Sequence, residues 1–398
     1  MHNLTKIKFY RRLLYLTYPV AWVFLYPIAL LKRKQPGALF FFFDRYAIGG
    51  AQRVHLDILE SVSEIPKKVY FTRLSENKKL KGSFYSFPFT RCRDIHFWCD
   101  NLLFRLFTVH YYAFYLNRHR IPTVLSSNST FFYDMLPFLN RNTYTIELLH
   151  NFTYGDNGME FFGLANHRYL TRRMVIDAIT KERIRMQYQQ YKIGPSYFDR
   201  VKLVEFGVQA PPSLSKDLSP PLKVLYAGRG GNQKRVWLVS RVADYFLERK
   251  ERVEFHFAGT MLDDLSEATK AGSVIHGELG DKAELDKLYQ ECHVIILTSS
   301  YEGFPAMIKE GMAWGCVPVV TALEGNKIHL RHLFNAMLIG EIENENEVVA
   351  EAIRHLQLLV DDPALLGGLS RSAYEYARMH FSKDAFIKVY RDLLATGL

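Results

Sequence analysis

The chain has 398 residues, 48% of them hydrophobic and 23% charged, a composition typical of a folded globular protein and not of a disordered one. This length is too great for one ordinary hydrophobic core, so we expect two domains. The net charge is +10, but +7 of it lies in the first 43 residues, which hold no acidic side chain. Such a local concentration argues against the broad basic surface of a nucleic-acid-binding protein.

The cysteines are few and scattered, at positions 92, 99, 292 and 316. This indicates no disulfide framework and fits reduced thiols in a cytosolic compartment. Cys92, His96 and Cys99 are close enough in sequence to suggest a metal site. No fourth ligand is apparent, so we expect ordinary thiols there.

The first expected element is an apolar segment, Leu13 to Leu31, whose 19 residues carry no charge and are enough to cross a membrane. Pro19 and Pro27 each remove a helical hydrogen bond, and the four Tyr and Trp residues of the segment favour the membrane interface. Basic clusters flank it on both sides. We therefore expect it to lie in the headgroup region of an anionic membrane. The alternatives are a true span, a helix packed on the domain, and a signal peptide, for which LKRKQPG is a poor cleavage context.

The next elements predict a doubly wound domain over residues 36–208. Residues 37–44, GALFFFFD, indicate a strand buried on both faces. A glycine pair follows and opens a helix with apolar residues at Val54, Ile58 and Val62, so the three pieces start a βαβ unit. Further strands are predicted at 68–71, 123–126, 144–149 and 174–178.

The second half begins after a linker at residues 209–221, which hold four prolines. From residue 222 to 381, apolar strand runs alternate with amphipathic helices. The strands are KVLYAGR, VEFHFAG, SVIHGEL, HVIILTSS and VPVVT. Strict alternation predicts a parallel sheet, and ligands of such sheets bind at the carboxyl ends of the strands.

Residues 299–321 read SSYEGFPAMIKEGMAWGCVPVVT and are the most informative stretch. We expect one helix from Glu302 onward, which places Glu302 and Glu310 on one face about 12 Å apart. The amino end of such a helix attracts an anion such as phosphate. Two carboxylates at that separation suit two polyols, such as a sugar ring and a ribose. By spacing alone, a solvent-facing helix with two unremarkable glutamates is the alternative.

The same stretch resembles the signature of family 4-type retaining glycosyltransferases, the glycosyl transferases group 1, in which seven residues separate two glutamates inside EGFP…EAMA.G.PVV. It departs at Gly311, where alanine is usual. The resemblance covers residues 222–325 well. It implies an α/β protein of the GT-B fold, with two Rossmann-like doubly wound parallel-sheet domains facing each other across a cleft. It also implies that a last helix, residues 382–398, crosses back to the first domain.

A second match, YAGRGGNQKRV, resembles the GR…K pattern of that family, with Arg229 and Lys234 five residues apart. Two fixed cations can neutralise a departing diphosphate without a metal, and Gly228 lets the backbone approach phosphate. The alternative is a turn whose basic residues are solvated and have no binding role. The resemblance further assigns the donor sugar to Glu302 and the ribose to Glu310. The other donor-binding residues that it implies are Gly303, Phe304, Pro305, His276, Gly277 and Leu279.

The first half carries a thinner resemblance. Gly49 and Gly50 resemble a glycine loop that faces the donor phosphates, although a simple turn explains them too. His150 ends a predicted strand, where the family commonly has a histidine near the transferred sugar; a structural histidine is the alternative. Asn151 stands where aspartate is frequent, and Asp156 is a further polar candidate.

The resemblance implies retaining transfer from a UDP- or GDP-sugar to a hydroxyl acceptor. The basic, aromatic N-terminal segment suggests a glycan or lipid-linked acceptor at a membrane, as in polysaccharide or lipopolysaccharide biosynthesis. We expect no metal cofactor, because no carboxylate pair with metal-ligand spacing accompanies the phosphate site. The aromatic and basic residues of 91–120 suit a lipid-linked acceptor, or form a core helix with snorkelling side chains.

The expected location is cytoplasmic, peripheral or monotopic on the inner face of the membrane, with an anionic membrane and no nucleic acid as partner. The alternatives are an inactive nucleotide-sugar binder or membrane scaffold, and a GT-B nucleotide-sugar epimerase, which product analysis without an acceptor distinguishes.

Overall fold

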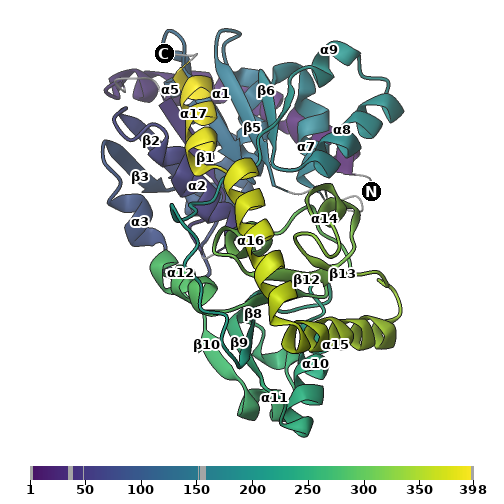
Figure 1. The fold of residues 1–398 in the computed structure, drawn as a ribbon. Coiled ribbons are helices and arrows are strands. Elements are labelled where there is room, and N and C mark those ends of the chain that lie inside the picture. Colours follow the sequence, from purple (N-terminus) through teal and green to yellow (C-terminus); the bar gives the residue numbers. More distant parts are fainter. Residues whose placement is uncertain (1–2, 35–38, 48, 151, 153–157, 396–398) are drawn as a thin grey trace. The chain divides into compact units, whose positions relative to one another are not determined.

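The computed structural model describes residues 3–34, 39–47, 49–150, 152 and 158–395. The chain forms two compact units, each with its own parallel sheet flanked by helices (Figure 1). Unit 1 comprises Met1–Glu205 and Ala385–Leu398, and unit 2 comprises Phe206–Asp384. The predicted α/β class with two doubly wound parallel sheets is confirmed.

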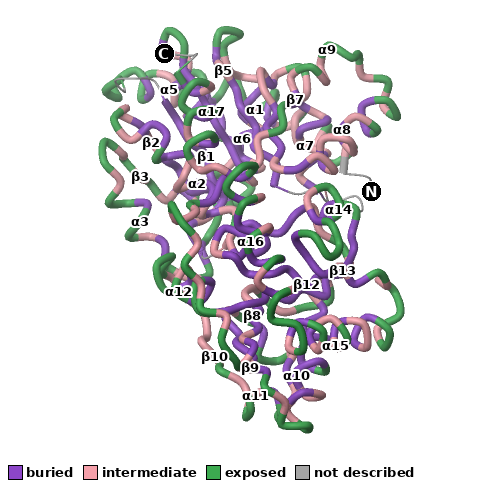
Figure 2. Tube along the Cα trace, viewed as in Figure 1, coloured by how far each residue is buried: buried purple, intermediate pink, exposed green. Residues whose placement is uncertain are grey.

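The sheet of unit 1 has seven strands in the order β3-β2-β1-β4-β5-β6-β7. They are β1 (Leu39–Phe43), β2 (Lys67–Phe71), β3 (Thr90–Asp94), β4 (Thr123–Ser127), β5 (Tyr144–Leu149), β6 (Arg172–Val175) and β7 (Val201–Leu203). Every residue of β1 is buried, as its unbroken apolar run predicts, and central strands of both sheets are mostly buried (Figure 2). The strand order reverses between β1 and β4, which makes their carboxyl ends a topological switch point.

The helices of unit 1 are α1 (Asn3–Leu31), α2 (Gly50–Glu60), α3 (Lys81–Tyr85), α4 (His96–Asp100), α5 (Leu102–Asn117), α6 (Thr130–Met135), α7 (Met159–Asn166), α8 (Ala178–Gln190) and α9 (Pro195–Phe198). α17 (Lys383–Ala395) begins in unit 2, and its residues from Ala385 on belong to unit 1. Within unit 1, Arg391 Nε donates a hydrogen bond to the Ser61 carbonyl at 3.1 Å. This bond fixes α17 to the end of α2.

Two details of unit 1 differ from the prediction. The strand expected at 174–178 ends at Val175, because Asp177 caps α8 by accepting a hydrogen bond from the Thr180 N–H at 2.7 Å. β3 was not predicted, since Thr90–Asp94 alternates half-buried and exposed residues at a sheet edge and has no apolar run.

The suggested metal site beside β3 is not assembled. His96 Nδ1 contacts Asp94 Oδ1 at 2.6 Å, and the Cys92 thiol donates to the Phe84 carbonyl. Burial raises the pKa of both the Cys92 and Cys99 thiols to about 12. Among the residues that the structure describes, no group of three or more His, Cys, Asp and Glu side chains lies close enough to bind a metal ion. All four cysteines are free thiols.

A buried ion pair joins β5 to β6. Arg173 Nε donates to Glu147 Oε2, the Tyr133 hydroxyl donates to Glu147 Oε1, and Arg173 Nη1 donates to the Tyr188 hydroxyl at 3.0 Å. Because neither charged side chain reaches solvent, removing one partner would leave an uncompensated buried charge and cost about 3–5 kcal/mol. The network fixes the strand that ends just before His150.

Unit 2 has six strands in the order β10-β9-β8-β11-β12-β13. They are β8 (Leu222–Arg229), β9 (Val253–Thr260), β10 (Val274–Gly277), β11 (Val294–Leu297), β12 (Val317–Thr321) and β13 (Met337–Ile339). The helices are α10 (Val236–Arg249), α11 (Glu267–Gly272), α12 (Lys282–Glu291), α13 (Ala306–Ala313), α14 (Glu324–His329), α15 (Glu345–Asp361) and α16 (Pro363–His380). Here the order reverses between β8 and β11, which places the second switch point at their carboxyl ends.

The segment predicted as a linker, residues 209–221, packs on unit 2. Lys216 Nζ donates to the carbonyls of Tyr289 at 2.7 Å and Trp314 at 2.8 Å. The Tyr374 hydroxyl donates to the Pro211 carbonyl at 2.8 Å. The segment is therefore an ordered part of unit 2, and the boundary between the units falls just before it, between Glu205 and Phe206.

Candidate functional site

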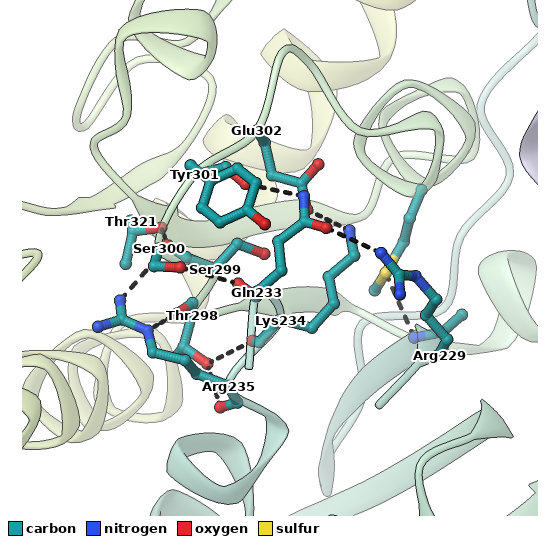
Figure 3. Close-up of polar contacts among 12 residues, drawn as sticks. Arg229, Gln233, Lys234, Arg235, Thr298, Ser299, Ser300, Tyr301, Glu302 and Thr321 are labelled. Carbon is teal, nitrogen blue, oxygen red and sulfur yellow. Dashed lines mark hydrogen bonds and ion pairs between the residues drawn. The ribbon is translucent and has the colours of Figure 1, made fainter. Parts of the chain in front are cut away.

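The switch point of unit 2 brings two loops together. Arg229 is the last residue of β8, and residues 298–305 form the loop that follows β11. The strands are neighbours in the sheet, so the loops at their carboxyl ends meet (Figure 3). Arg229, Lys234 and Glu302, which the two motifs predict as site residues, lie on these loops.

Lys234 and Glu302 form an ion pair, and both side chains are mostly buried. Gln233 joins the same two loops: its side-chain oxygen accepts a hydrogen bond from Arg229 Nη2 at 2.8 Å, and its nitrogen donates to the Tyr301 carbonyl at 3.0 Å. Figure 3 shows these contacts between the two loops. Arg229 and Lys234 are thus held at one place, where an anion would meet both cations.

Arg235 is a residue that the sequence did not single out. It has a left-handed backbone, with φ of 48°, which is uncommon for a residue with a side chain. Its buried guanidinium donates to the carbonyls of Thr298 at 2.8 Å, Ser299 at 3.4 Å and Ile342 at 2.7 Å. Burial lowers the pKa of this guanidinium. Arg235 fixes the loop after β11 relative to α10 and so positions its neighbour Lys234.

The prediction that Glu302 and Glu310 share a helix face is wrong. α13 begins at Ala306 with Pro305 as its cap, so Glu302 lies in the preceding loop. Proline disfavours helical backbone in the residue before it, which explains why the helix does not extend back to Glu302. Glu310 lies on α13, and its Oε2 accepts a hydrogen bond from the Tyr289 hydroxyl at 2.9 Å.

The rest of the EGFP stretch is packed into unit 2. The Phe304 ring contacts the rings of His329 and Phe381, with centroids 4.5 and 5.6 Å apart. The Gly303 carbonyl lies so close to Gly325 that a Cβ there would stand 1.5 Å from it. Only glycine fits at position 325, which is how the loop carrying Glu302 passes over α14.

The glycines after β8 are tightly placed as well. Gly228 lies on β8, and a Cβ on the neighbouring Gly259 would stand 1.9 Å from the Gly228 carbonyl oxygen. Gly231 has φ of +106°, a conformation that glycine adopts without strain. Its N–H donates to Asp264 Oδ2 at 2.7 Å. The sequence did not point to Asp264, whose carboxylate accepts this hydrogen bond.

Three of the residues predicted to bind the donor lie at the edge of the sheet beside β9. His276 lies on β10, Gly277 ends that strand with φ of +65°, and Leu279 is in the loop beyond. His276 Nε2 contacts His256 Nδ1 at 3.0 Å, and His256 Nε2 contacts Glu254 Oε1 at 2.6 Å. The Glu254 carboxylate can only accept a hydrogen bond, so His256 donates to it through Nε2. When both imidazoles are neutral, His256 Nδ1 then accepts a hydrogen bond from His276 Nε2. The chain of bonds fixes the orientation of the His276 ring.

In unit 1, His150 follows β5 and is buried, with its Nε2 3.2 Å from Nε2 of His55. The His55 ring stacks on Phe43, with centroids 4.0 Å apart. Burial lowers the pKa of His150 to about 4. Burial is also the main cause that lowers the pKa of His55, and the neighbouring His150 is the second. Both imidazoles are therefore neutral at pH 7, and one Nε2 donates to the other. His55 is the partner that sequence reasoning missed.

The glycine pair lies at the switch point of unit 1. Gly49 caps α2 with an extended backbone, and Gly50 is the first residue of that helix. Asn151 and Asp156 lie outside the described residues. The structure thus assembles Arg229, Lys234 and Glu302 within unit 2, while His150, Gly49 and Gly50 belong to unit 1.

The buried histidines predict acid sensitivity. An unfolded His150 binds a proton near pH 6.5, whereas the folded one does so only near pH 4, so the native state loses stability as the pH falls through this window. We expect His150 alone to lower the free energy of unfolding by about 2 kcal/mol between pH 7 and 5. Denaturant titrations of the wild type and His150→Gln at both pH values test this. An equal loss in the two proteins would contradict it.

Comparison with known proteins agrees with this arrangement. Residues 215–378 match the family model described as Glycosyl transferases group 1. No curated protein sequence matches the chain. Among solved structures, HepE of Anabaena in complex with UDP and glucose superimposes with a TM-score of 0.67 at 13% identity, over 90% of this chain and 99% of HepE.

Two further structures are similar. The apo form of the lipopolysaccharide outer core galactosyltransferase WaaB gives a TM-score of 0.61 at 16% identity, over 90% of this chain and 99% of WaaB. TarM, known from S. aureus, gives 0.57 at 16% identity over 72% of this chain, which spans 58% of the length of TarM. At such identities the likeness shows the fold alone. The chain therefore has the GT-B fold, and its unit 2 carries the match to the glycosyl transferases group 1.

Proposed function

We propose that this protein transfers a sugar, with retention of anomeric configuration, from a UDP- or GDP-sugar to a hydroxyl of a glycan or lipid-linked acceptor. In that reaction the bond between the anomeric carbon and the diphosphate oxygen breaks, the acceptor oxygen bonds to the same carbon, and the hydroxyl proton is lost. Negative charge accumulates on the departing diphosphate. The best contribution a protein can make is to hold positive charge ready at that place.

The observation that supports the proposal is the network at the switch point of unit 2. Arg229 and Lys234 are fixed there by Gln233 and Glu302, with no need to reorganise when charge develops. In this proposal a bound diphosphate takes the place of part of the Lys234–Glu302 pairing, which frees the Glu302 carboxylate to accept hydrogen bonds from sugar hydroxyls. Glu310 is proposed to hold the ribose, and residues 276–279 the base.

The acceptor and the location belong to the same proposal. A neighbour, WaaB, is a lipopolysaccharide outer core galactosyltransferase, and the basic, aromatic first helix of this chain suits a membrane. We place the protein on the cytoplasmic face of the membrane, where it would elongate a lipid-linked glycan in polysaccharide or lipopolysaccharide biosynthesis. His150 is proposed to face the transferred sugar, and Gly49 and Gly50 the donor phosphates.

Transfer should survive removal of divalent metal ions, because two cationic side chains stand where a metal would otherwise neutralise the diphosphate. The test incubates the chain with UDP- and GDP-sugars and a panel of glycan acceptors, with and without EDTA. The anomeric proton of the product is then read by NMR. Equal rates and a product anomer like that of the donor are expected. Loss of transfer in EDTA that Mg²⁺ or Mn²⁺ restores, or an inverted anomer, would contradict the proposal.

A further inference from the structure

The outward face of α1 carries exposed apolar side chains from Phe9 to Leu31. Phe9, Leu16, Phe24 and Leu31 are 58, 74, 68 and 86% exposed, and they recur every seven or eight residues, so they share one face. α1 is the one helix among the described residues that is long and apolar enough to cross a membrane, and only 17% of its most apolar stretch is buried. A face of this length exposed to water is unusual for a soluble protein.

The opposite face of α1 packs on unit 1, where it lies along α5. The buried residues of α1 are Leu14, Ala21 and Ala29. Polar contacts fix both ends and the middle. Arg11 Nη2 donates to Asn166 Oδ1 at 2.8 Å, Thr17 Oγ1 contacts His110 Nε2 at 3.1 Å, and Arg118 Nη1 donates to the Ala29 carbonyl at 2.5 Å.

The prolines do not break α1, and its packing on unit 1 argues against a membrane span. The helix runs unbroken through Pro19 and Pro27, so the prolines do not divide it. A helix that crossed the bilayer would have to leave the surface of unit 1 and expose the buried His110 and its other partners. α1 therefore unites two of the predicted alternatives, since it is packed on the domain by one face and presents an apolar face outward.

A second exposed apolar cluster lies on α4 and the first turns of α5. The rings of Phe97, Trp98 and Phe104 contact one another, with centroids 5.2 to 5.7 Å apart, and all three are exposed. Leu103 and Phe107, also exposed, lie on the same side of α5 as His110, because the spacings of four and three residues fall on one helix face. We call Phe97, Trp98, Leu103, Phe104 and Phe107 the α4–α5 cluster.

The cluster lies at the amino end of α1. Residues further along α1 contact residues further along α5. Tyr10 lies by Arg105, Thr17 by His110, and Ala29 by Arg118. α1 and α5 are therefore parallel, so the first turns of α5 adjoin the first turns of α1. The side of α5 that contacts α1 is also the side that carries Leu103 and Phe107.

Basic side chains border both parts of this surface. Lys6, Lys8 and Arg12 are exposed at the amino end of α1, and the exposed Lys32, Arg33 and Lys34 follow its carboxyl end. At that end, the pKa of Lys68 is lowered to about 8, mainly by burial and secondly by the positive charges of Arg91, Arg93 and Lys32. Asp100 is an exposed acid beside the α4–α5 cluster, and α1 itself has none. Apolar side chains bordered by cations match the interface of an anionic bilayer.

We propose that the outward face of α1 and the α4–α5 cluster together form one surface that binds the headgroup region of an anionic lipid bilayer without crossing it. This deepens the membrane location proposed above and does not depend on the glycosyl transfer. A second copy of the chain is the less suitable occupant. Pairing α1 with itself, in either direction, would oppose the basic ends of one copy to those of the other.

The four tryptophans allow a direct test. Trp22 lies on α1 and Trp98 in the α4–α5 cluster, while Trp237 and Trp314 lie in unit 2. Full chains that keep one tryptophan each, with Phe at the other three positions, are mixed with phosphatidylcholine vesicles with or without phosphatidylglycerol. The phospholipids carry bromine either near the headgroup or near the chain end. Bromine quenches tryptophan at short range and so reports depth.

With anionic vesicles we expect shallow bromine to quench both Trp22 and Trp98 more than deep bromine, and added salt to weaken binding. Trp237 should not respond. Stronger quenching of Trp22 by deep bromine would mean a span and overturn the proposal. Vesicle binding without quenching of Trp98 would show that the α4–α5 cluster is not part of the binding surface. Dimers that do not bind vesicles would show that the surface binds a second copy of the chain. Either result would also overturn the proposal.

A variant pair checks the cluster independently. Phe97→Ser with Leu103→Ser should lower vesicle affinity at least about tenfold, since each removes an exposed apolar side chain from the interface. Met379→Ser, an exposed apolar residue on α16 of unit 2, is the matched control and should not change it. Unaltered vesicle affinity of the cluster variant would contradict the proposal. Nucleoside diphosphate binding, measured on the same variants, separates this outcome from failure of the proposed function.

Discussion

Replacing Lys234 with Ala should weaken binding of the cognate nucleoside diphosphate by about 10- to 150-fold, which corresponds to about 1.5–3 kcal/mol for a hydrogen bond to a charged group. Lys234 is mostly buried and paired with Glu302, so the variant loses a cation and also leaves that carboxylate beside the incoming phosphates. Arg229→Ala should act in the same direction. Its effect should be smaller, because this guanidinium is exposed and bound to Gln233.

Calorimetry with UDP and GDP measures both variants. The matched control is Lys270→Ala, which removes a lysine paired with Glu267 on the surface of the same unit and should leave affinity unchanged. Melting temperatures establish that each variant is folded. If both Lys234→Ala and Arg229→Ala bind the nucleotide as tightly as the wild type, these residues do not form the phosphate site.

His150→Ala should lower kcat by about 100-fold or more while nucleoside diphosphate affinity stays nearly intact. A residue that acts mainly where charge develops affects turnover more than ground-state binding. His150 belongs to unit 1, whereas the residues proposed for the diphosphate and ribose belong to unit 2. Its partner His55 supports the assignment, because the Nε2 contact orients the ring and burial keeps it neutral.

A purely structural histidine predicts another pattern, namely a lower melting temperature with normal turnover in the folded fraction. His119→Ala is the control, since His119 is also a buried histidine of unit 1 but lies at the end of α5. Measuring kcat, nucleotide affinity and melting temperature on one preparation of each variant distinguishes the cases. A destabilised His150→Ala that turns over normally would exclude a catalytic role.

The strands of unit 2 were predictable because buried parallel strands leave continuous apolar runs. HVIILTSS and VPVVT became β11 and β12 within a few residues. β3, with the sequence TRCRD, has no such run, and the apolar run of β13 is only three residues long, so both strands were missed. Their strand form comes from pairing with β12 and β2, which only the folded sheet provides.

The site was predicted in part. The two motifs predicted Arg229, Lys234 and Glu302 as site residues, and the structure has them on neighbouring loops of unit 2. Helical spacing was extended across Pro305, so Glu302 was wrongly assigned to α13. Gln233 and Arg235 were missed because they bind backbone carbonyls of the loop after β11, and no residue pattern marks such contacts.

The composition of α1 predicted the length of its apolar segment, but it did not predict which face of the helix is buried. Leu14, Ala21 and Ala29 face α5, and this follows from the shape of unit 1 and not from hydropathy.

The central claim is that unit 2 binds a nucleoside diphosphate through side chains alone. The most direct measurement is calorimetry of the wild-type chain with UDP and GDP, each with EDTA present, which is also the reference for the Lys234 variant. The account predicts saturable binding of one of the two nucleotides in EDTA. Absence of binding to both in EDTA, or binding that appears only when Mg²⁺ or Mn²⁺ is added, would contradict it.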